Sequence, residues 1–110
     1  MSLNAMHRSI MIFSDTQEKA EKKLNEMIDG LDEDILVRKR DFVKTETKTI
    51  QARRFSEGCR GYRYREVYVD YSLCDLDTVN LIAIKLVPPH YYMNEPYDGN
   101  YNWRDHVHYF

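Results

Sequence analysis

The sequence predicts a single small α/β domain with a mixed sheet of about four strands, two helices packed on it and an irregular aromatic C-terminal tail. Three observations predict this class: an unbroken apolar run followed by helix-start signals, later segments that alternate like strands, and a second helical pattern ending at two prolines. Because 110 residues hold one hydrophobic core, we expect one domain, with an α/β core at residues 9–89 and the tail at residues 90–110.

The first strand and helix are predicted from residues 10–31. Residues 10–13 are all apolar, which is typical of a strand covered on both faces. Ser14 or Asp15 then offers a side-chain acceptor for the free amides of a first helical turn. Gly30 offers a left-handed stop near the end of this helix. The apolar face of the helix consists of Ala20, Leu24, Met27, Ile28 and Leu31.

The following segment is predicted to form an antiparallel hairpin. It is rich in Val, Ile, Thr and Phe, and we place its strands at residues 35–43 and 47–55 around a turn at residues 44–46. The turn contains no Gly or Asn, so its position is defined only to within several residues. One long amphipathic helix is the alternative, but three β-branched threonines at positions 45, 47 and 49 argue against it.

A fourth strand and a second helix follow. Residues 67–71 alternate between apolar and polar side chains, which predicts a strand that reaches Asp70. Asp75 is placed to cap the next helix, and Pro88 and Pro89 end it. The apolar face of this helix consists of Leu76, Val79, Ile82, Ala83 and Leu86.

The predicted element order is β-α-β-β-β-α. We expect the first strand and the strand that ends at Asp70 to lie parallel and adjacent, with the first helix forming a right-handed crossover. The helices are expected to cover one face of the sheet. The tail is expected to lie over part of the other face or in a dimer interface.

The tail is unusually aromatic. Half of the fourteen aromatic residues of the chain lie between Tyr91 and Phe110, too many for a free linker. We expect the tail either to cover an apolar surface of its own domain or to offer one to a partner. The candidate partner-binding residues are Tyr97, Tyr101 and Trp103.

The net charge of −2 conceals a strongly basic segment. Residues 38–65 hold ten Lys or Arg residues against three acidic residues, a local balance of +7 that leaves −9 on the remainder. Such a segment is typical of a polyanion-binding face, and long basic side chains on a solvated hairpin give the same count. The candidate nucleic-acid-binding residues are Arg38, Arg40, Arg53, Arg54, Arg60, Tyr62, Arg63, Tyr64 and Arg65.

The loop at residues 58–65, Gly-Cys-Arg-Gly-Tyr-Arg-Tyr-Arg, is the segment that reads most clearly as a motif. Its two glycines permit backbone conformations closed to other residues, and its three arginines supply planar forks that match phosphate or carboxylate oxygens. Tyr62 and Tyr64 are placed to stack on the bases of a single strand. In the alternative interpretation, one arginine pairs with Asp70 or Glu66 while the tyrosines pack against the sheet.

Together with the strand after it, this loop resembles the region around the second acidic motif of large terminase and helicase-type ATPases. In those proteins an Arg-Gly-x-Arg loop precedes an apolar strand that ends in Asp-Glu. The chain also resembles a group of small bacteriophage and prophage proteins that keep an Arg-Gly-Tyr-Arg loop, an apolar strand and an aspartate. The residues that carry the resemblance are Arg60, Gly61, Tyr62, Arg63, Val67, Val69 and Asp70.

The chain departs from the ATPase pattern at two places. The first strand of such ATPases runs into a Gly-rich phosphate loop, whereas residues 13–18 here read Phe-Ser-Asp-Thr-Gln-Glu, with no glycine, no lysine and two acids. Asp70 matches the magnesium-holding aspartate, but Tyr71 stands where a glutamate would orient the attacking water. The resemblance therefore implies the shape of a degenerate P-loop ATPase, and we expect neither enzymatic activity nor a cofactor.

Signals for a metal site or a nucleophile are weaker. His106 and His108 would point to the same side of a strand, and zinc accepts two such nitrogens with a carboxylate such as Asp105. His-x-His is nevertheless more typical of surface histidines, so no metal site is predicted. Cys59 and Cys74 form no CxxC pair and are expected to be reduced thiols in a cytoplasmic protein.

The sequence favours a non-catalytic, phage-type accessory protein that binds DNA or RNA through its basic loop and hairpin. The alternative is a protein-protein interaction module that docks onto a phage or host protein through the aromatic tail. A small metal-dependent enzyme is a third hypothesis. No run of eighteen apolar residues is present, so we expect no membrane partner. The oligomeric state stays open, a homodimer included.

Overall fold

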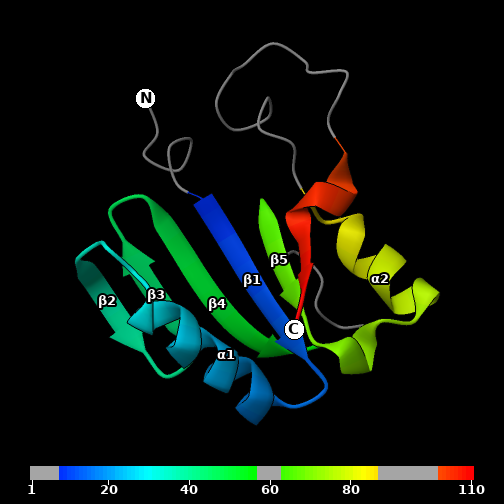
Figure 1. Ribbon diagram of the computed structural model, residues 1–110, viewed down its shortest axis with the longest axis horizontal. Coiled ribbons are helices and arrows are strands. Elements are labelled where there is room, and N and C mark those ends of the chain that lie inside the picture. The colour runs from blue at the N-terminus through cyan, green and yellow to red at the C-terminus, as the bar shows by residue number, and fades with distance from the viewer. Residues whose placement is uncertain (1–7, 57–62, 87–101) are drawn as a thin grey trace.

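The computed structural model of the protein describes residues 8–56, 63–86 and 102–110. In these residues, six strands form one mixed sheet in the order β2-β3-β4-β1-β5-β6 (Figure 1). The strands are β1 (Arg8–Ser14), β2 (Ile35–Lys39), β3 (Phe42–Thr45), β4 (Lys48–Arg54), β5 (Glu66–Val69) and β6 (Val107–Tyr109). The helices are α1 (Gln17–Asp29) and α2 (Leu76–Ala83), with the short 3-10 helices η2 (Tyr71–Leu73) and η3 (Trp103–His106). The predicted α/β class is confirmed, with two more strands than expected.

Strand β1 lies inside the sheet and is covered on both faces, and its unbroken apolar run predicts that cover. It pairs in parallel with β4 on one side and with β5 on the other. Ile10 and Ile12 face one side of the sheet while Met11 and Phe13 face the other, and all four side chains are buried. The predicted parallel pairing of the first strand with the strand that precedes Asp70 is therefore confirmed.

Helix α1 begins later than predicted. Thr16 is its N-cap and accepts a hydrogen bond from the backbone N–H of Lys19 at 3.2 Å. Ser14 still belongs to β1, so neither it nor Asp15 caps the helix. Gly30 does end α1, but with a φ of −98°, outside the predicted left-handed region.

The predicted strand at residues 35–43 is in fact two strands. A tight turn at Arg40 and Asp41 separates β2 from β3, and β3 then pairs with β4 around the second turn. The buried hydroxyl of Thr45 supports that second turn by accepting from the backbone N–H of Lys48 at 3.2 Å. Neither turn contains Gly or Asn, which explains why the sequence placed only one of them.

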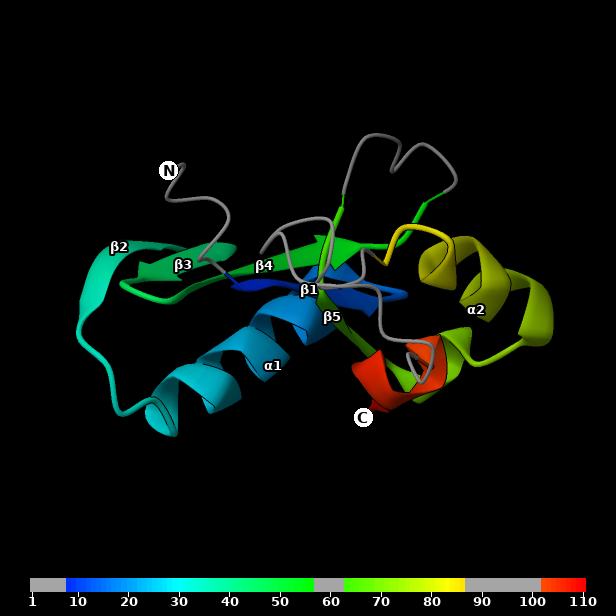
Figure 2. The same ribbon diagram turned by 90° about the horizontal axis from the view of Figure 1, so that it is seen from above.

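The two helices pack on opposite faces of the sheet, so the prediction that they cover one face is wrong. Ile10 and Ile12 contact a cluster that contains Ala20 and Leu24 of α1, whereas Phe13 belongs to a cluster with Ile82 of α2. Figure 2 shows α1 beneath the sheet and α2 beside its β5 end. Because every apolar residue of β1 is buried, the strand needs cover on both faces.

The end of the tail is not irregular. Strand β6 adds in parallel to β5, with Val107 opposite Val67 and Tyr109 opposite Val69. The prediction of an irregular tail is therefore wrong for residues 102–110, while residues 90–101 lie outside the described residues. None of the helices in the described ranges is long and apolar enough to cross a membrane.

Candidate functional site

The carboxyl ends of β1 and β5 form the first candidate site. The chain leaves β1 toward α1 on one face of the sheet and leaves β5 toward η2 and α2 on the other. Open α/β sheets commonly bind ligands at such a switch point. Ser14, Asp15 and Asp70 meet here. Asp70 therefore lies beside the end of β1, as the predicted parallel pairing of these two strands implies.

Ser14 joins the two carboxylates. Its buried hydroxyl oxygen lies 3.0 Å from Asp15 Oδ1 and 3.0 Å from Asp70 Oδ2, and its single proton is donated to one of them at a time. Lys19 Nζ lies 3.1 Å from Asp15 Oδ1. The backbone N–H of Ser72 donates to Asp70 Oδ1 at 2.9 Å.

Both carboxyl groups are ionised at neutral pH. The pKa of Asp15 is lowered mainly by the hydrogen bond from Lys19 and next by that from Ser14. The pKa of Asp70 is lowered mainly by the backbone N–H of Ser72, with Ser14 contributing less. Two carboxylates beside one ammonium group disfavour a nucleotide phosphate at this switch point. Among the described residues, no three His, Cys, Asp or Glu side chains are arranged to hold a metal ion.

The arginines predicted to bind nucleic acid do not form one surface. Arg53 and Arg54 lie at the carboxyl end of β4, whereas Arg63 and Arg65 precede β5. Since β4 and β5 both run parallel to β1, one pair lies at the carboxyl ends of these strands and the other pair lies at their amino ends. Arg38 and Arg40 lie in β2 and the turn after it, beside the first pair. Arg60 and Tyr62 lie outside the described residues.

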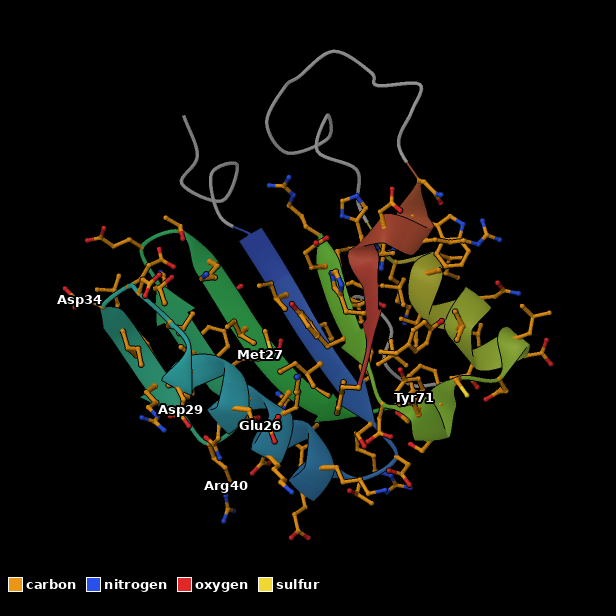
Figure 3. All side chains as sticks on the ribbon, viewed as in Figure 1. Glu26, Met27, Asp29, Asp34, Arg40 and Tyr71 are labelled. Atoms are coloured by element: carbon orange, nitrogen blue, oxygen red, sulfur yellow. The ribbon has the colours of Figure 1, made fainter. Side chains whose placement is uncertain are left out.

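Several of these residues already have partners within the fold. Arg53 forms an ion pair with Asp41, and Arg40 Nε lies 3.4 Å from Glu21 Oε1 of α1. Figure 3 shows Arg40 beside α1, far from Tyr71 on the α2 side of the molecule.

Tyr64 is not placed to stack on a base. Its ring is fully buried in the cluster under α2, 5.9 Å from the ring of Phe13. Its hydroxyl donates to the carbonyl of Ile82 at 2.5 Å. The alternative interpretation, in which the tyrosine packs against the sheet, therefore holds for Tyr64.

A basic surface lies on the face of β2, β3 and β4 opposite α1. Val43, Ile50 and Ala52 face α1, so their strand neighbours face the other side. The helices of the described residues pack elsewhere, with α1 on the opposite face and α2 over β1 and β5. We call this basic half of the sheet the open sheet face; it carries Lys39, Phe42, Lys44, Thr49, Gln51 and Arg53. Of these six residues, only Arg53 was a predicted nucleic-acid-binding residue.

The two candidate metal-binding histidines share a carboxylate that the sequence did not suggest. His106 Nδ1 contacts one oxygen of Glu66, and His108 Nε2 lies 3.3 Å from the other. The His108 ring also stacks on Tyr68, with ring centroids 4.7 Å apart. Asp105, the predicted partner, is exposed, and these contacts hold β6 on β5.

An exposed apolar surface lies around α2 and β6. Five large apolar side chains are strongly exposed there: Leu76 (74%), Ile84 (74%), Tyr71 (64%), Leu81 (43%) and Tyr109 (43%). The rings of Tyr71 and Tyr109 stack with centroids 5.8 Å apart, and Leu76 and Tyr109 line one groove. We call these five residues, with the groove, the α2–β6 surface.

The groove lies between α2 and β6 and has a volume of about 310 Å³. Its walls include Val79 and Asn80 of α2 and Val107 of β6, and Trp103 lies at one side. The guanidinium of Arg104 stacks over Trp103, 4.5 Å from its ring centroid. Trp103 is thus one predicted partner-binding residue that the structure places in a groove, whose lining is both apolar and polar. Tyr97 and Tyr101 lie outside the described residues.

Leu76 was expected in the core, but it is among the most exposed large apolar side chains of the described residues. The signal available in the sequence is the composition of α2, in which five of eight residues are apolar and do not all lie on one side of the helix. A short helix on a sheet buries only one side, here Val79 and Ile82, so the remaining apolar residues must face outward.

No protein-family model matches the chain, and no curated protein is detectably similar to it.

Proposed function

We propose that this protein is a non-catalytic interaction module that docks onto another protein chain through the α2–β6 surface. The observation that carries the proposal is that two strongly exposed side chains, Leu76 and Tyr109, line the groove that holds Trp103, while Tyr71 stacks on Tyr109. Single exposed apolar residues are ordinary on protein surfaces, whereas a contiguous patch with a groove is typical of interaction sites.

The free energy available at this surface is substantial. The exposed fractions of the five side chains correspond to about three fully exposed large apolar residues. Burying that many residues would contribute roughly 5–9 kcal/mol before the costs of association. The surface also contains aromatic residues, which are common among the residues that dominate binding energy.

Site-specific photo-crosslinking in the cells that naturally express this protein tests this function. A photoreactive phenylalanine analogue at Leu76 should give discrete crosslinked products. The same analogue at Leu36 is the control, because Leu36 is 56% exposed but lies on β2 at the opposite edge of the sheet.

Any partner found in this way must bind in purified form. Because Trp103 is the only tryptophan of the chain and lines the groove, its fluorescence should change on binding. Leu76→Asp should weaken the binding while Leu36→Asp should not. Equal crosslinking from both positions, or a purified partner that binds Leu76→Asp normally, would contradict the proposal.

We propose nucleic-acid binding as a second function, at the open sheet face. Lys39, Lys44 and Arg53 surround Phe42 on this face, and single-stranded nucleic acids bind surfaces that combine cations with an aromatic ring. The face belongs to the basic hairpin that the sequence singled out. The arginines of the loop contribute less to this proposal, because Arg63 and Arg65 lie at the amino ends of the parallel strands and Arg60 lies outside the described residues.

Fluorescence anisotropy with short labelled single-stranded oligonucleotides tests the second function. Binding should weaken as salt rises, and Lys39→Ala/Lys44→Ala should reduce the slope of log affinity against log salt by about 1.4, or about 0.7 for each lost phosphate contact. Lys22→Ala on the exposed side of α1 is the control. Absence of binding at low salt, or a slope that the double substitution leaves unchanged, would count against it.

We also propose kinship with the degenerate terminase or helicase-type core. Strands β1 and β5 are parallel neighbours, and Asp70 follows β5 beside the end of β1, as that resemblance implies. A phage-type accessory role and a cytoplasmic location remain predictions from the sequence.

A further inference from the structure

We propose that the outer edge of β2 binds the same edge of a second copy of this protein in antiparallel orientation, so that two sheets join into one. The contact is independent of the α2–β6 surface, because β2 and β6 are the first and last strands of the described sheet. Charge selects the partner, and main-chain hydrogen bonds between the two strands supply affinity.

Strand β2 offers an exposed edge for such pairing. Within the described sheet it is an outermost strand, and β3 is its neighbour on the inner side. All five of its residues are exposed, and they include three consecutive large apolar side chains, those of Ile35, Leu36 and Val37. The outward backbone N–H and C=O groups of an edge strand are a template for another strand.

The charges around β2 identify that other strand. Residues 32–34 read Asp-Glu-Asp, residues 35–37 read Ile-Leu-Val and residues 38–40 read Arg-Lys-Arg. Figure 3 shows Asp34 and Arg40 at opposite ends of the strand. A complementary antiparallel strand needs the same order of acidic, apolar and basic residues, and β2 of a second copy has it. Parallel pairing would place like charges opposite one another, which destabilises a sheet.

An irregularity in β2 fixes the position of the two-fold axis. The register between β2 and β3 shifts between Ile35 and Val37, so these two residues face opposite sides of the sheet. Directly opposite residues of an antiparallel pair must face the same side. An axis between Leu36 and Val37 meets this condition, because it places Ile35 opposite Arg38 of the partner subunit and both lie on the α1 side.

The same axis forms two ion pairs between the copies. It places Asp34 of each copy opposite Lys39 of the partner subunit. Both side chains are exposed, and neither forms an ion pair within the described residues. Glu33 contributes less, because it pairs with Lys48 of its own chain at 3.2 Å. Exposed ion pairs add little affinity, but they penalise a wrong partner or register.

The arrangement predicts a weak, reversible dimer. A contact between two short strand edges is smaller than a standard interface of roughly 800 Å² per partner. The axis is perpendicular to the joined sheet, so the α1 helices of both copies lie on one side and both open sheet faces lie on the other.

Analytical ultracentrifugation at low salt tests the dimer. The wild type should show an equilibrium between monomer and dimer at concentrations up to about 1 mM. Asp34→Lys should weaken association by about tenfold, because it turns two attractive pairs of each dimer into repulsive ones, and Lys39→Glu should do the same. Asp105→Lys is the matched control: it makes the same charge change at an exposed residue beside β6 and should alter association less than about twofold.

A mixture of the two variants tests the register. Asp34→Lys mixed with Lys39→Glu should associate within about threefold of the wild type, because the introduced lysine then lies opposite the introduced glutamate. The native Lys39 and Asp34 of the two chains form the other pair. Circular dichroism should show each variant folded, since both positions are exposed.

Three results would overturn the proposal. The first is a wild type that stays monomeric at about 1 mM, where even a millimolar affinity would be visible. The second is a dimer that both single variants form as tightly as the wild type. The third is a mixture that associates no better than the variants alone.

Crosslinking distinguishes this contact from the docking function. A photoreactive analogue at Leu36 should give a product that contains only two copies of this chain, whereas Leu76 should give a product with a different protein. A Leu36 product that contains a different protein would contradict the pairing of β2 with itself. Loss of the dimer would leave the Leu76 product unchanged.

Discussion

Replacing Tyr64 with phenylalanine should destabilise the domain by about 1 kcal/mol, the net value of one buried neutral hydrogen bond. The ring would keep its place in the cluster that contains Phe13, since the substitution removes only the hydroxyl. That hydroxyl donates to the carbonyl of Ile82 in the interior. The loss is therefore one hydrogen bond with little change in packing.

A second donor to the same carbonyl group keeps the expected loss of unfolding free energy close to that of an ordinary hydrogen bond. The carbonyl of Ile82 also accepts from the backbone N–H of Lys85 at 3.3 Å, so removal of the tyrosine hydroxyl does not leave it unpaired. An orphaned buried acceptor would add a desolvation penalty of about 1–3 kcal/mol. For a domain of this size, a loss of about 1 kcal/mol lowers the melting temperature by roughly 4 °C.

Urea unfolding followed by circular dichroism measures the difference. Tyr71→Phe is the matched control, because the Tyr71 side chain is 64% exposed, and its variant should stay within about 0.5 kcal/mol of the wild type. The m-value should be unchanged in both variants. Equal stabilities of Tyr64→Phe and the wild type would refute the buried hydrogen bond, and a loss above about 3 kcal/mol would refute the second donor to Ile82.

Three further substitutions test other parts of the structure. Leu24→Ala should cost about 3 kcal/mol in urea unfolding, since Leu24 is fully buried between α1 and the sheet, and a loss below about 1 kcal/mol would contradict that packing. Thr16→Ala should lower the free energy of unfolding by about 1 kcal/mol, because it removes the N-cap of α1. An unchanged free energy would indicate that Asp15 caps the helix instead. Asp70→Asn should lower stability at pH 7 by less than about 1 kcal/mol, because its carboxylate is screened by solvent. Since the pKa of Asp70 is lowered by folding, that difference should shrink as the pH falls through and below 3.8, and a difference that grows in acid would contradict it.

The best predictions came from segments whose pattern depends on their own neighbours. The apolar run of β1 and the apolar face of α1 are visible in the sequence, and both elements form where those patterns lie. Asp75 caps α2 as predicted, accepting from the backbone N–H of Thr78 at 3.0 Å. Caps and periodicities act over three or four residues, so they can be read without the tertiary fold.

The candidate surfaces were predicted less well because they combine residues far apart in the sequence. Glu66 contacts His106 and His108, which lie 40 or more residues later in the sequence, and no local sequence pattern predicts that contact. Trp103 was identified as a partner-binding residue from composition, but its groove is completed by α2. The arginine count was correct, yet it carries no information about which edge of the sheet each arginine occupies.

The sequence by itself determined the α/β class, the burial of β1 on both faces and the parallel pairing of β1 with β5, because unbroken and periodic apolar runs restrict how each segment can be buried. Only the tertiary structure decided that β6 joins the sheet, that the two helices take opposite faces, and that Tyr64 is buried while Leu76 is exposed. A three-residue strand is stable only through its partner, and an apolar helix is buried only on the side that its neighbours cover. These outcomes depend on contacts between distant segments, and the same contacts leave the outer side of α2 available for a partner.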